Sequence, residues 1–340
     1  MSEINIDLPP LEERPLVTFA LFAYNQEKYI REAVEGAFSQ TYEPLEIVLS
    51  DDCSTDRTFE IIEEMAAGYR GPHDLVVRQN DTNQGLAVHI NHVMSQVCGK
   101  LVVVAAGDDV SFPHRVAVVV QHWIEGGRES GSIFSRFQAI DTLGKITFNE
   151  SLINKKKLTL ADRDFGRTRA ITVGTRGCAH AWTRNIFDLF GPIHERIIHE
   201  DITIPLRSLL LGSVTFLPED LVLYRMVAGS QSRVSFSSHR ERFQKMARYW
   251  EGRVANYEQY QVDVEKISGK DTTFIADVEW LSKAINHEAN IAQANQLFFG
   301  GQYVDRFKVV LDFRKRISPL RRLKFLVLAL IPPLYGIQIK

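Results

Sequence analysis

The chain has 340 residues, 45% of them hydrophobic and 24% charged, which is the composition of an ordinary folded protein. Its 40 basic and 42 acidic residues leave a net charge of −2, so the overall charge does not favour nucleic acid as a partner. No run reaches the roughly 18–20 continuous apolar residues that a membrane span requires, and three scattered cysteines without metal-ligand spacing fit a reducing compartment.

Residues 1–14 are polar and predict an N-terminal tail, not a signal peptide. Apolar runs then predict four strands, at 16–23, 45–50, 75–78 and 101–106. The segments between them carry apolar residues at helical spacing, and Asn25 and Asp56 are placed to cap the first two helices. This alternation predicts an α/β fold with a doubly wound, mostly parallel sheet and flanking helices.

Aromatic and acidic residues stand at the ends of three of these strands. Phe22 and Tyr24 end the first strand, Asp52 follows the second, and Asp108 and Asp109 follow the fourth. The carboxyl ends of parallel strands meet at one edge of an open sheet, where ligands bind. An aromatic ring, a carboxylate that can accept from a base N–H and a carboxylate pair suited to a hard divalent cation predict a nucleotide diphosphate site.

Each of these features has a structural alternative. Asp108 and Asp109 could form a solvated turn, Tyr24 could be a core aromatic, and Asp51 with Asp52 could cap the next helix. A dinucleotide fold would need G-x-G-x-x-G after the first strand, and the sequence has neither this pattern nor a Walker A loop. A bound diphosphate would therefore need a metal, rather than a glycine-rich loop, to neutralise it.

Five segments in order resemble landmarks of the family 2 glycosyltransferases, which have the GT-A fold. They are Val17–Asn25, Phe38–Tyr42, Ile47–Asp56, Asn83–Gly85 and Gly107–Asp109. The resemblance implies that Tyr24 stacks on the nucleotide base, that Asp52 accepts from its ring N–H and that Asp108 lies near the ribose. It also implies that Asp109, together with Asp108, holds Mn²⁺ or Mg²⁺ at the diphosphate.

The same resemblance places five further residues around the nucleotide sugar, namely Phe22, Asn25, Asn83, Gly85 and Arg225. Three positions depart from the family pattern. Ala106 stands where many relatives have a further Asp, Ile90 where many have Arg, and Val227 where His is common. We therefore expect metal binding to fall mainly on Asp109.

The second half of the chain is predicted to supply the acceptor side. It contains a predicted helix at 115–125, a strand at 133–140, a hairpin turn at 141–145 and a polar surface loop at 149–170. Residues 174–184 resemble the family segment that lines the donor-sugar pocket. The alternative is a simple tight turn rich in small residues.

Glu200 and Asp201 stand at the start of a predicted helix, where capping and the helix dipole alone favour a carboxylate. Inverting glycosyl transfer also needs a general base that deprotonates the acceptor hydroxyl. In the resemblance, the Glu-Asp pair at this helix start supplies that base. We predict Asp201 as the base and Glu200 as a residue that positions the acceptor.

Residues 239–340 are predicted to form a helical C-terminal region. Basic and apolar residues alternate from Arg306 to Phe325, and a short apolar tail follows. Such a stretch is typical of an interfacial anchor on an anionic membrane surface. The alternatives are a helix packed on the catalytic domain and a homodimer contact.

These features predict a GT-A catalytic domain at 15–238, with a nucleotide-sugar half at 15–110 and an acceptor half at 111–238. The predicted protein is a metal-dependent, inverting glycosyltransferase on the cytoplasmic face of a bacterial plasma membrane. It would transfer a hexosyl or N-acetylhexosaminyl group from a UDP-sugar to a glycan or polyprenyl-linked glycan in surface-polysaccharide biosynthesis. The alternatives are a catalytically inactive nucleotide-sugar- or carbohydrate-binding protein and a nucleotidyltransferase.

Overall fold

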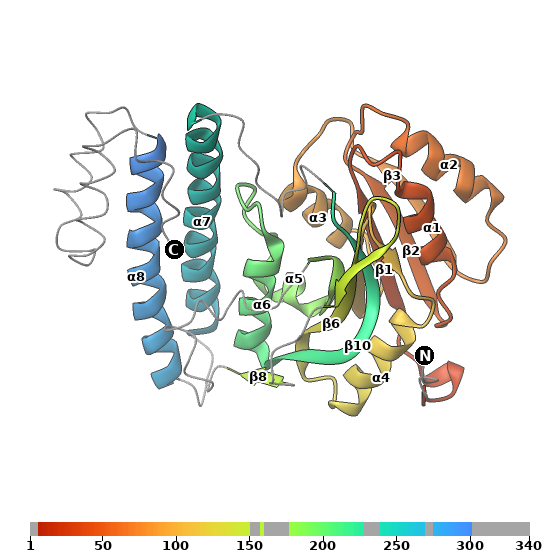
Figure 1. The fold of residues 1–340 in the computed structure, drawn as a ribbon. Helices are drawn as coiled ribbons and strands as arrows, with labels where there is room; N and C mark the ends of the chain where they lie inside the picture. The colour runs from red at the N-terminus through yellow and green to blue at the C-terminus, as the bar shows by residue number, and fades with distance from the viewer. Residues whose placement is uncertain (1–5, 150–156, 160–176, 228–238, 269–274, 301–340) are drawn as a thin grey trace. The chain divides into compact units, whose positions relative to one another are not determined.

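The computed structural model describes residues 6–149, 157–159, 177–227, 239–268 and 275–300 (Figure 1). The chain divides into two compact units. The first comprises Met1–Glu195 and His199–Ala228, and the second comprises Arg196–Ile198 and Gly229–Lys340. The boundary predicted at residue 238 lies outside the described residues.

The described residues of the first unit form one ten-stranded sheet, and the N-terminal half of this sheet is parallel. A short 3-10 helix, η1 (Leu11–Glu13), precedes it. The parallel strands are β1 (Val17–Ala23), β2 (Leu45–Asp51), β3 (Asp74–Gln79) and β4 (Leu101–Ala106), in the order β3-β2-β1-β4. The helices between them are α1 (Ile30–Phe38), α2 (Thr58–Gly68) and α3 (Leu86–Met94). The predicted α/β alternation is confirmed.

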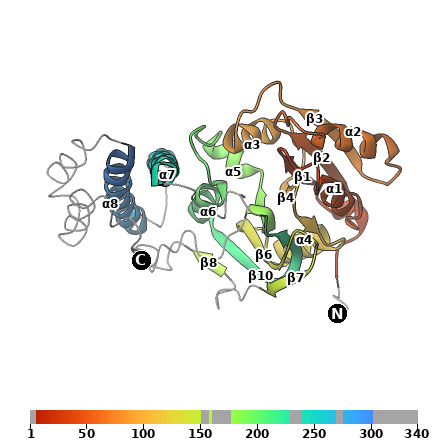
Figure 2. The ribbon, with the colours of Figure 1, turned by 45° about the horizontal axis from the view of Figure 1, so that its top comes forward.

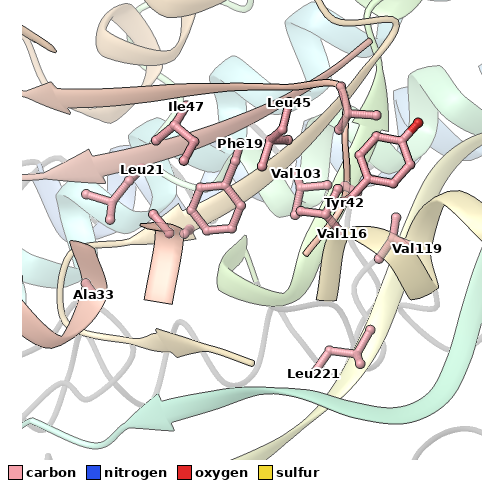
Figure 3. Packing of buried hydrophobic residues seen from close by; sticks show 14 of the residues in the cluster. Phe19, Leu21, Ala33, Tyr42, Leu45, Ile47, Val103, Val116, Val119 and Leu221 are labelled. Carbon is pink, nitrogen blue, oxygen red and sulfur yellow. The ribbon is translucent and has the colours of Figure 1, made fainter. Parts of the chain in front are cut away.

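Apolar side chains from β1, β2 and β4 form the core with residues of the helices. Phe19 of β1 and Val103 of β4 pack with Ala33 of α1 and with Val116 of α4 (Arg115–Glu125), as Figure 3 shows. Burying one such large side chain stabilises the fold by about 1.5–3 kcal/mol. Every residue of β1 and β2 is buried, so the polar groups that end these strands are held on a rigid frame.

The second half of the sheet mixes parallel and antiparallel pairs. Its elements are β5 (Val110–Ser111), α4 (Arg115–Glu125), β6 (Ser130–Ile140), β7 (Ile146–Asn149), β8 (Lys157–Thr159), η4 (Gly177–Ala179), β9 (His180–Thr183), α5 (Asn185–Phe190), α6 (Glu200–Leu211) and β10 (Ser213–Arg225). Strand β9 pairs antiparallel with both β4 and β6, and β10 runs parallel to β6. The predicted helix at 115–125 and the hairpin turn at 141–145 are confirmed.

One local prediction needs correction. Asn25 does not cap α1, because the N-cap is Tyr29 and Asn25 adopts a left-handed conformation with φ 52°. Its side-chain oxygen accepts a hydrogen bond from the Thr55 N–H at 2.8 Å instead. In the second half, β10 is one long strand with irregularities in its register with β6.

The described part of the second unit consists of the long helices α7 (His239–Ser268) and α8 (Ile275–Gly300), which lie side by side in Figures 1 and 2. Tyr260 of α7 and Ala292 of α8 are among its buried residues. In the part of the chain that the structure describes, no helix is long and apolar enough to cross a membrane. The predicted interfacial anchor and most of the loop at 149–170 lie outside the described residues.

Candidate functional site

The ends of three parallel strands meet at β1. The Asp52 N–H donates to the Ala23 carbonyl and the Gly107 N–H donates to the Phe22 carbonyl, both at 2.9 Å. The chain packs closely at Gly107, where a Cβ atom would lie 2.4 Å from the Gln26 side-chain oxygen. The loops that follow β1, β2 and β4 therefore start side by side, as the sequence predicted.

The Asp52 carboxylate organises the loop that leads into α3. It is buried, and its Oδ1 accepts from Asn80 Nδ2 at 2.6 Å and from Gln84 N at 2.9 Å. Its Oδ2 accepts from Gly85 N at 2.9 Å. Gly85 has φ +80°, which favours glycine, and Asn83 Oδ1 also accepts from its N–H. Described residues thus fill three of the roughly four acceptor positions of this carboxylate.

A polar network that sequence reasoning missed supports Asp52. Arg78 donates to Ser50 Oγ at 2.6 Å and to Asn80 Oδ1 at 2.5 Å, and Asn80 in turn holds Asp52. Ser50 Oγ also pairs with His89 Nε2 at 2.5 Å. Burial lowers the pKa of His89 to about 4, so the ring is neutral at pH 7. The strand-end argument could have found Arg78 and Asn80, because they lie at the end of β3.

The end of β1 presents one buried and one exposed aromatic ring. Phe22 is buried and packs edge-to-face on His89, with ring centroids 5.0 Å apart. Tyr24 is 42% exposed, so it is not the core aromatic that the structural alternative required. An exposed ring at this edge of the sheet can stack on a planar ligand.

Asn25 joins the loops that follow β1 and β2. Its N–H donates to Ser54 Oγ at 2.8 Å, and its Oδ1 accepts from Thr55 N. Thus Asn25, like Asn83, has its polar side chain engaged in shaping a loop at this edge.

At the end of β4, Arg225 of β10 holds the turn that carries Asp108 and Asp109. The backbone N–H of Arg225 donates to Asp109 Oδ1 at 2.7 Å, and its Nε donates to the Asp108 carbonyl at 3.0 Å. Its Nη2 forms an ion pair with Glu32 Oε2 at 2.7 Å, and its guanidinium lies over the Tyr29 ring. The Arg225 side chain, 1% exposed, is therefore already bound within the protein.

The electrostatics of the turn favour a bound cation. Burial, together with the neighbouring charge of Asp108, raises the pKa of Asp109 to about 8. A hydrogen bond from the Arg225 N–H and another from the Cys178 thiol oppose this rise. Burial also raises the pKa of Asp108. A buried and a partly buried carboxylate on adjacent residues are each stabilised in the ionised form by a nearby positive charge.

The two carboxylates fit a hard divalent ion that takes its remaining ligands from a phosphate. Among the described residues, no group of three or more His, Cys, Asp or Glu side chains could hold a metal alone. Mg²⁺ is commonly bound by one or two carboxylates with substrate phosphates as the remaining ligands. Asp109 and Asp108 match that pattern.

The predicted Glu-Asp pair begins α6, as expected. Glu200 is 8% exposed, and burial with the negative charge of Asp201 raises its pKa to about 8. Its carboxylate lies against η4, since a Cβ atom on Gly177 would be 2.1 Å from Glu200 Oε1. Asp201 is more exposed than Glu200. The pair thus offers one buried carboxyl group that is largely protonated at pH 7 and one more accessible carboxyl group.

Residues 18–185 match the family model described as Glycosyl transferase family 2. EpsE of Bacillus subtilis, which bears the name of a glycosyltransferase, is 39% identical over 102 residues, or 30% of this chain and 36% of EpsE. Chondroitin synthase of Escherichia coli is 28% identical over 159 residues, or 46% of this chain and 22% of that protein. The matches thus span about a third or less of the length of these two curated relatives.

Solved structures share the fold over most of this chain. The structure of S. aureus TarS 1-349 in complex with UDP-GlcNAc has a TM-score of 0.54 at 17% identity, covering 88% of this chain and 85% of that chain. The mannosyltransferase PcManGT from Pyrobaculum calidifontis, in complex with GDP-Man and Mn²⁺, has a TM-score of 0.52 at 17% identity, covering 97% and 85%. These similarities confirm the predicted GT-A fold.

Proposed function

The chain belongs to glycosyl transferase family 2 through residues 18–185, and we propose that it transfers a sugar from a nucleotide diphosphate to a glycan hydroxyl with inversion. One observation carries this proposal. The loops after β1, β2 and β4 begin side by side and bring an exposed Tyr24, the Asp52 carboxylate and the Asp108–Asp109 pair to one edge of the sheet. Tyr24 and Asp52 would bind the base, Asp108 would lie near the ribose, and Asp109 would hold the metal at the diphosphate.

We propose UDP as the nucleotide of the donor. Three described donors already bind Asp52, so its carboxylate has about one acceptor position left for the base. Uracil presents a single ring N–H between two carbonyl groups, whereas guanine presents two adjacent donors that prefer both carboxylate oxygens. The hydrogen bonding of Asp52 therefore favours uracil. TarS was solved with UDP-GlcNAc and PcManGT with GDP-Man, so the fold accommodates both bases.

Asp109, assisted by Asp108, would hold Mn²⁺ or Mg²⁺. When bound, the ion would offset the negative charge of the nucleoside diphosphate as it leaves. The Arg225 backbone N–H and the Cys178 thiol orient the Asp109 carboxylate for this role. Because Ala106 supplies no third carboxylate, we expect Asp109→Asn to abolish metal-dependent binding of UDP.

Asp201 would act as the general base. It would take the proton of the acceptor hydroxyl while the acceptor oxygen bonds to the anomeric carbon and the bond from that carbon to the diphosphate oxygen breaks. Glu200, largely protonated at pH 7 because of its burial, would donate a hydrogen bond that positions the acceptor. Both residues start α6, whose N-terminus favours the negative charge on Asp201.

A single panel of assays tests the proposal. Nucleotide sugars with Mn²⁺ are screened by thermal shift, and release of nucleoside diphosphate is then measured with glycan acceptors. We expect stabilisation by a UDP-sugar and release of UDP. Asp201→Asn should remove turnover and leave the calorimetric Kd for the donor unchanged. Donor binding without turnover in the unaltered protein would favour the inactive binding protein, and release of pyrophosphate would favour a nucleotidyltransferase.

The acceptor and the membrane surface form a separate part of the proposal. The basic and apolar residues from Arg306 onwards support a peripheral position on anionic lipid at the cytoplasmic face, where a polyprenyl-linked glycan of surface-polysaccharide biosynthesis would be the acceptor. Truncation after Pro319 should release the protein from anionic liposomes in a flotation assay. Unchanged flotation would favour a packed helix or a homodimer contact.

A further inference from the structure

The short helix η4 touches both acidic groups of the candidate site through consecutive residues. At Gly177, Glu200 Oε1 occupies the space where a Cβ atom would lie, 2.1 Å from the ideal Cβ position. At Cys178, the buried cluster that contains the thiol packs against Ala106, the last residue of β4, and the thiol lies beside the Asp109 carboxylate and lowers its pKa as a hydrogen-bond donor. Glu200 belongs to α6 and Asp109 follows β4, so η4 is the element that contacts both.

The position of η4 is fixed from two sides. Cys178 and Ala179 pack into an apolar cluster with Phe137 of β6 and Val222 of β10. On the other side, buried Arg115 donates to the carbonyl of His180, directly after η4, at 3.4 Å.

Arg115 also connects η4 and His180 to the turn that carries Asp109. Its guanidinium donates to the Val104 carbonyl at 2.7 Å and to Ser111 Oγ at 2.9 Å, and these residues flank the turn. The Arg115 side chain is fully buried. The C-terminal part of η4 therefore cannot move without breaking buried contacts.

We propose that η4 is a positioning element for catalysis, in which Gly177 seats the Glu200 carboxyl group and Cys178 seats the Asp109 carboxylate. This inference rests on the proposed function, because it assigns Asp109 to the diphosphate side and Glu200 to the acceptor side. Consecutive residues on one short helix set the spacing between the two groups. A misplacement of about 1 Å in such a site can cost about 100-fold in rate.

The substitution Gly177→Ala tests the acceptor side. The added Cβ collides with the far end of the flexible Glu200 side chain, so the carboxyl group moves while the fold is retained. We expect kcat to fall at least about 10-fold and the Kd for UDP with Mn²⁺ to stay within about twofold. Gly68→Ala is the matched control, because a Cβ at that helical glycine meets nothing within 4 Å.

The substitutions Cys178→Ala and Cys178→Ser test the diphosphate side. Alanine removes the donor to Asp109 and should raise the Kd for UDP with Mn²⁺ by about 10-fold, the usual effect of losing a partner of a metal ligand. Serine keeps a donor and should restore most of this affinity. Cys98→Ala, at an exposed cysteine, is the matched control.

Opposite effects at two neighbouring residues distinguish positioning from general damage. Equal losses of kcat and donor affinity in Gly177→Ala, or full UDP affinity in Cys178→Ala, would overturn the proposal. If the unaltered protein transfers no sugar, the proposed function fails independently. A crystal structure of Gly177→Ala then decides the inference: we expect a displaced Glu200 carboxyl group and an unchanged bond from Arg225 N to Asp109, whereas an unmoved Glu200 refutes it.

Discussion

Individual side chains at the candidate site gain their roles from hydrogen bonds that no sequence pattern contains. Asp52 was predictable because it follows a strand, yet the bonds that leave it about one acceptor position come from Asn80, Gln84 and Gly85. Its supporting network reaches back to Arg78 and His89, neither of which belongs to a family landmark. Ile90 stands where many relatives have arginine, and its side chain is buried. A cation is nevertheless present at this edge of the sheet, because the charges of Arg78 and Asp52 attract each other.

If Asp52 selects uracil over guanine, the substitution Asp52→Asn should weaken the binding of UDP. An asparagine amide presents one acceptor oxygen and replaces the other with a donor, which meets the N–H of Gly85 unfavourably. We expect the calorimetric Kd for UDP to rise at least about 10-fold. For the unaltered protein, GDP should bind at least about 10-fold more weakly than UDP. Equal affinities for UDP and GDP would contradict the acceptor count.

His89 makes the stability of the fold depend on pH. Its pKa is lowered to about 4 in the folded protein by burial, whereas the unfolded chain takes up the proton near 6.5. Between these values the unfolded state binds more protons, so this contribution to stability is present above pH 6.5 and is lost as the pH falls toward 4. The slope approaches about 1.4 kcal/mol per pH unit.

The substitution His89→Gln should remove this contribution to the pH slope. Urea unfolding at pH 7, 6 and 5 measures it as the difference between the slopes of the two proteins. At pH 8 histidine is neutral in both states, so any difference there reports packing and hydrogen bonding alone. Parallel stability curves for the two proteins from pH 7 to pH 5 would refute the assignment.

Secondary-structure elements of the first half follow closely from the sequence, because buried parallel strands are continuous apolar runs. The runs at 16–23, 45–50 and 101–106 match β1, β2 and β4 to within a residue. Asn25 failed as a cap because its side chain binds a neighbouring loop. In β10, Pro218 and two acidic residues interrupt the apolar pattern, and the sheet accommodates them as irregularities in register.

The end of β10 carries a residue whose contacts the sequence pattern did not specify. Arg225 was predicted as a ligand of the nucleotide sugar, whereas its side chain binds Asp108 and Glu32, which lie 117 and 193 positions away in the chain. No local pattern specifies partners at that separation. We propose that Arg225 acts as a clamp on the Asp108–Asp109 turn.

The substitution Arg225→Met separates the clamp from the predicted ligand role. It leaves the partly buried Asp108 carbonyl without this donor and removes the ion pair, so we expect a loss of about 2–4 kcal/mol in urea unfolding together with weaker UDP binding. Glu32→Gln, at a half-exposed partner, should cost less than about 1 kcal/mol. Weaker binding with unchanged stability would support direct contact with the diphosphate instead.

At the scale of the whole molecule, all the candidate site residues lie in the first compact unit. A ligand that binds only the folded form stabilises the elements that hold it by mass action. Hydrogen exchange on the full chain with UDP and Mn²⁺ should therefore slow at the ends of β1, β2 and β4 and in the turn after β4. The amides of α7 and α8, in the second unit, should exchange at unchanged rates. The Asp109→Asn variant is the control, because it should show no slowing in either unit. Equal slowing in both units would mean that the helical unit takes part in binding the donor, which would overturn the assignment of the site to the first unit alone.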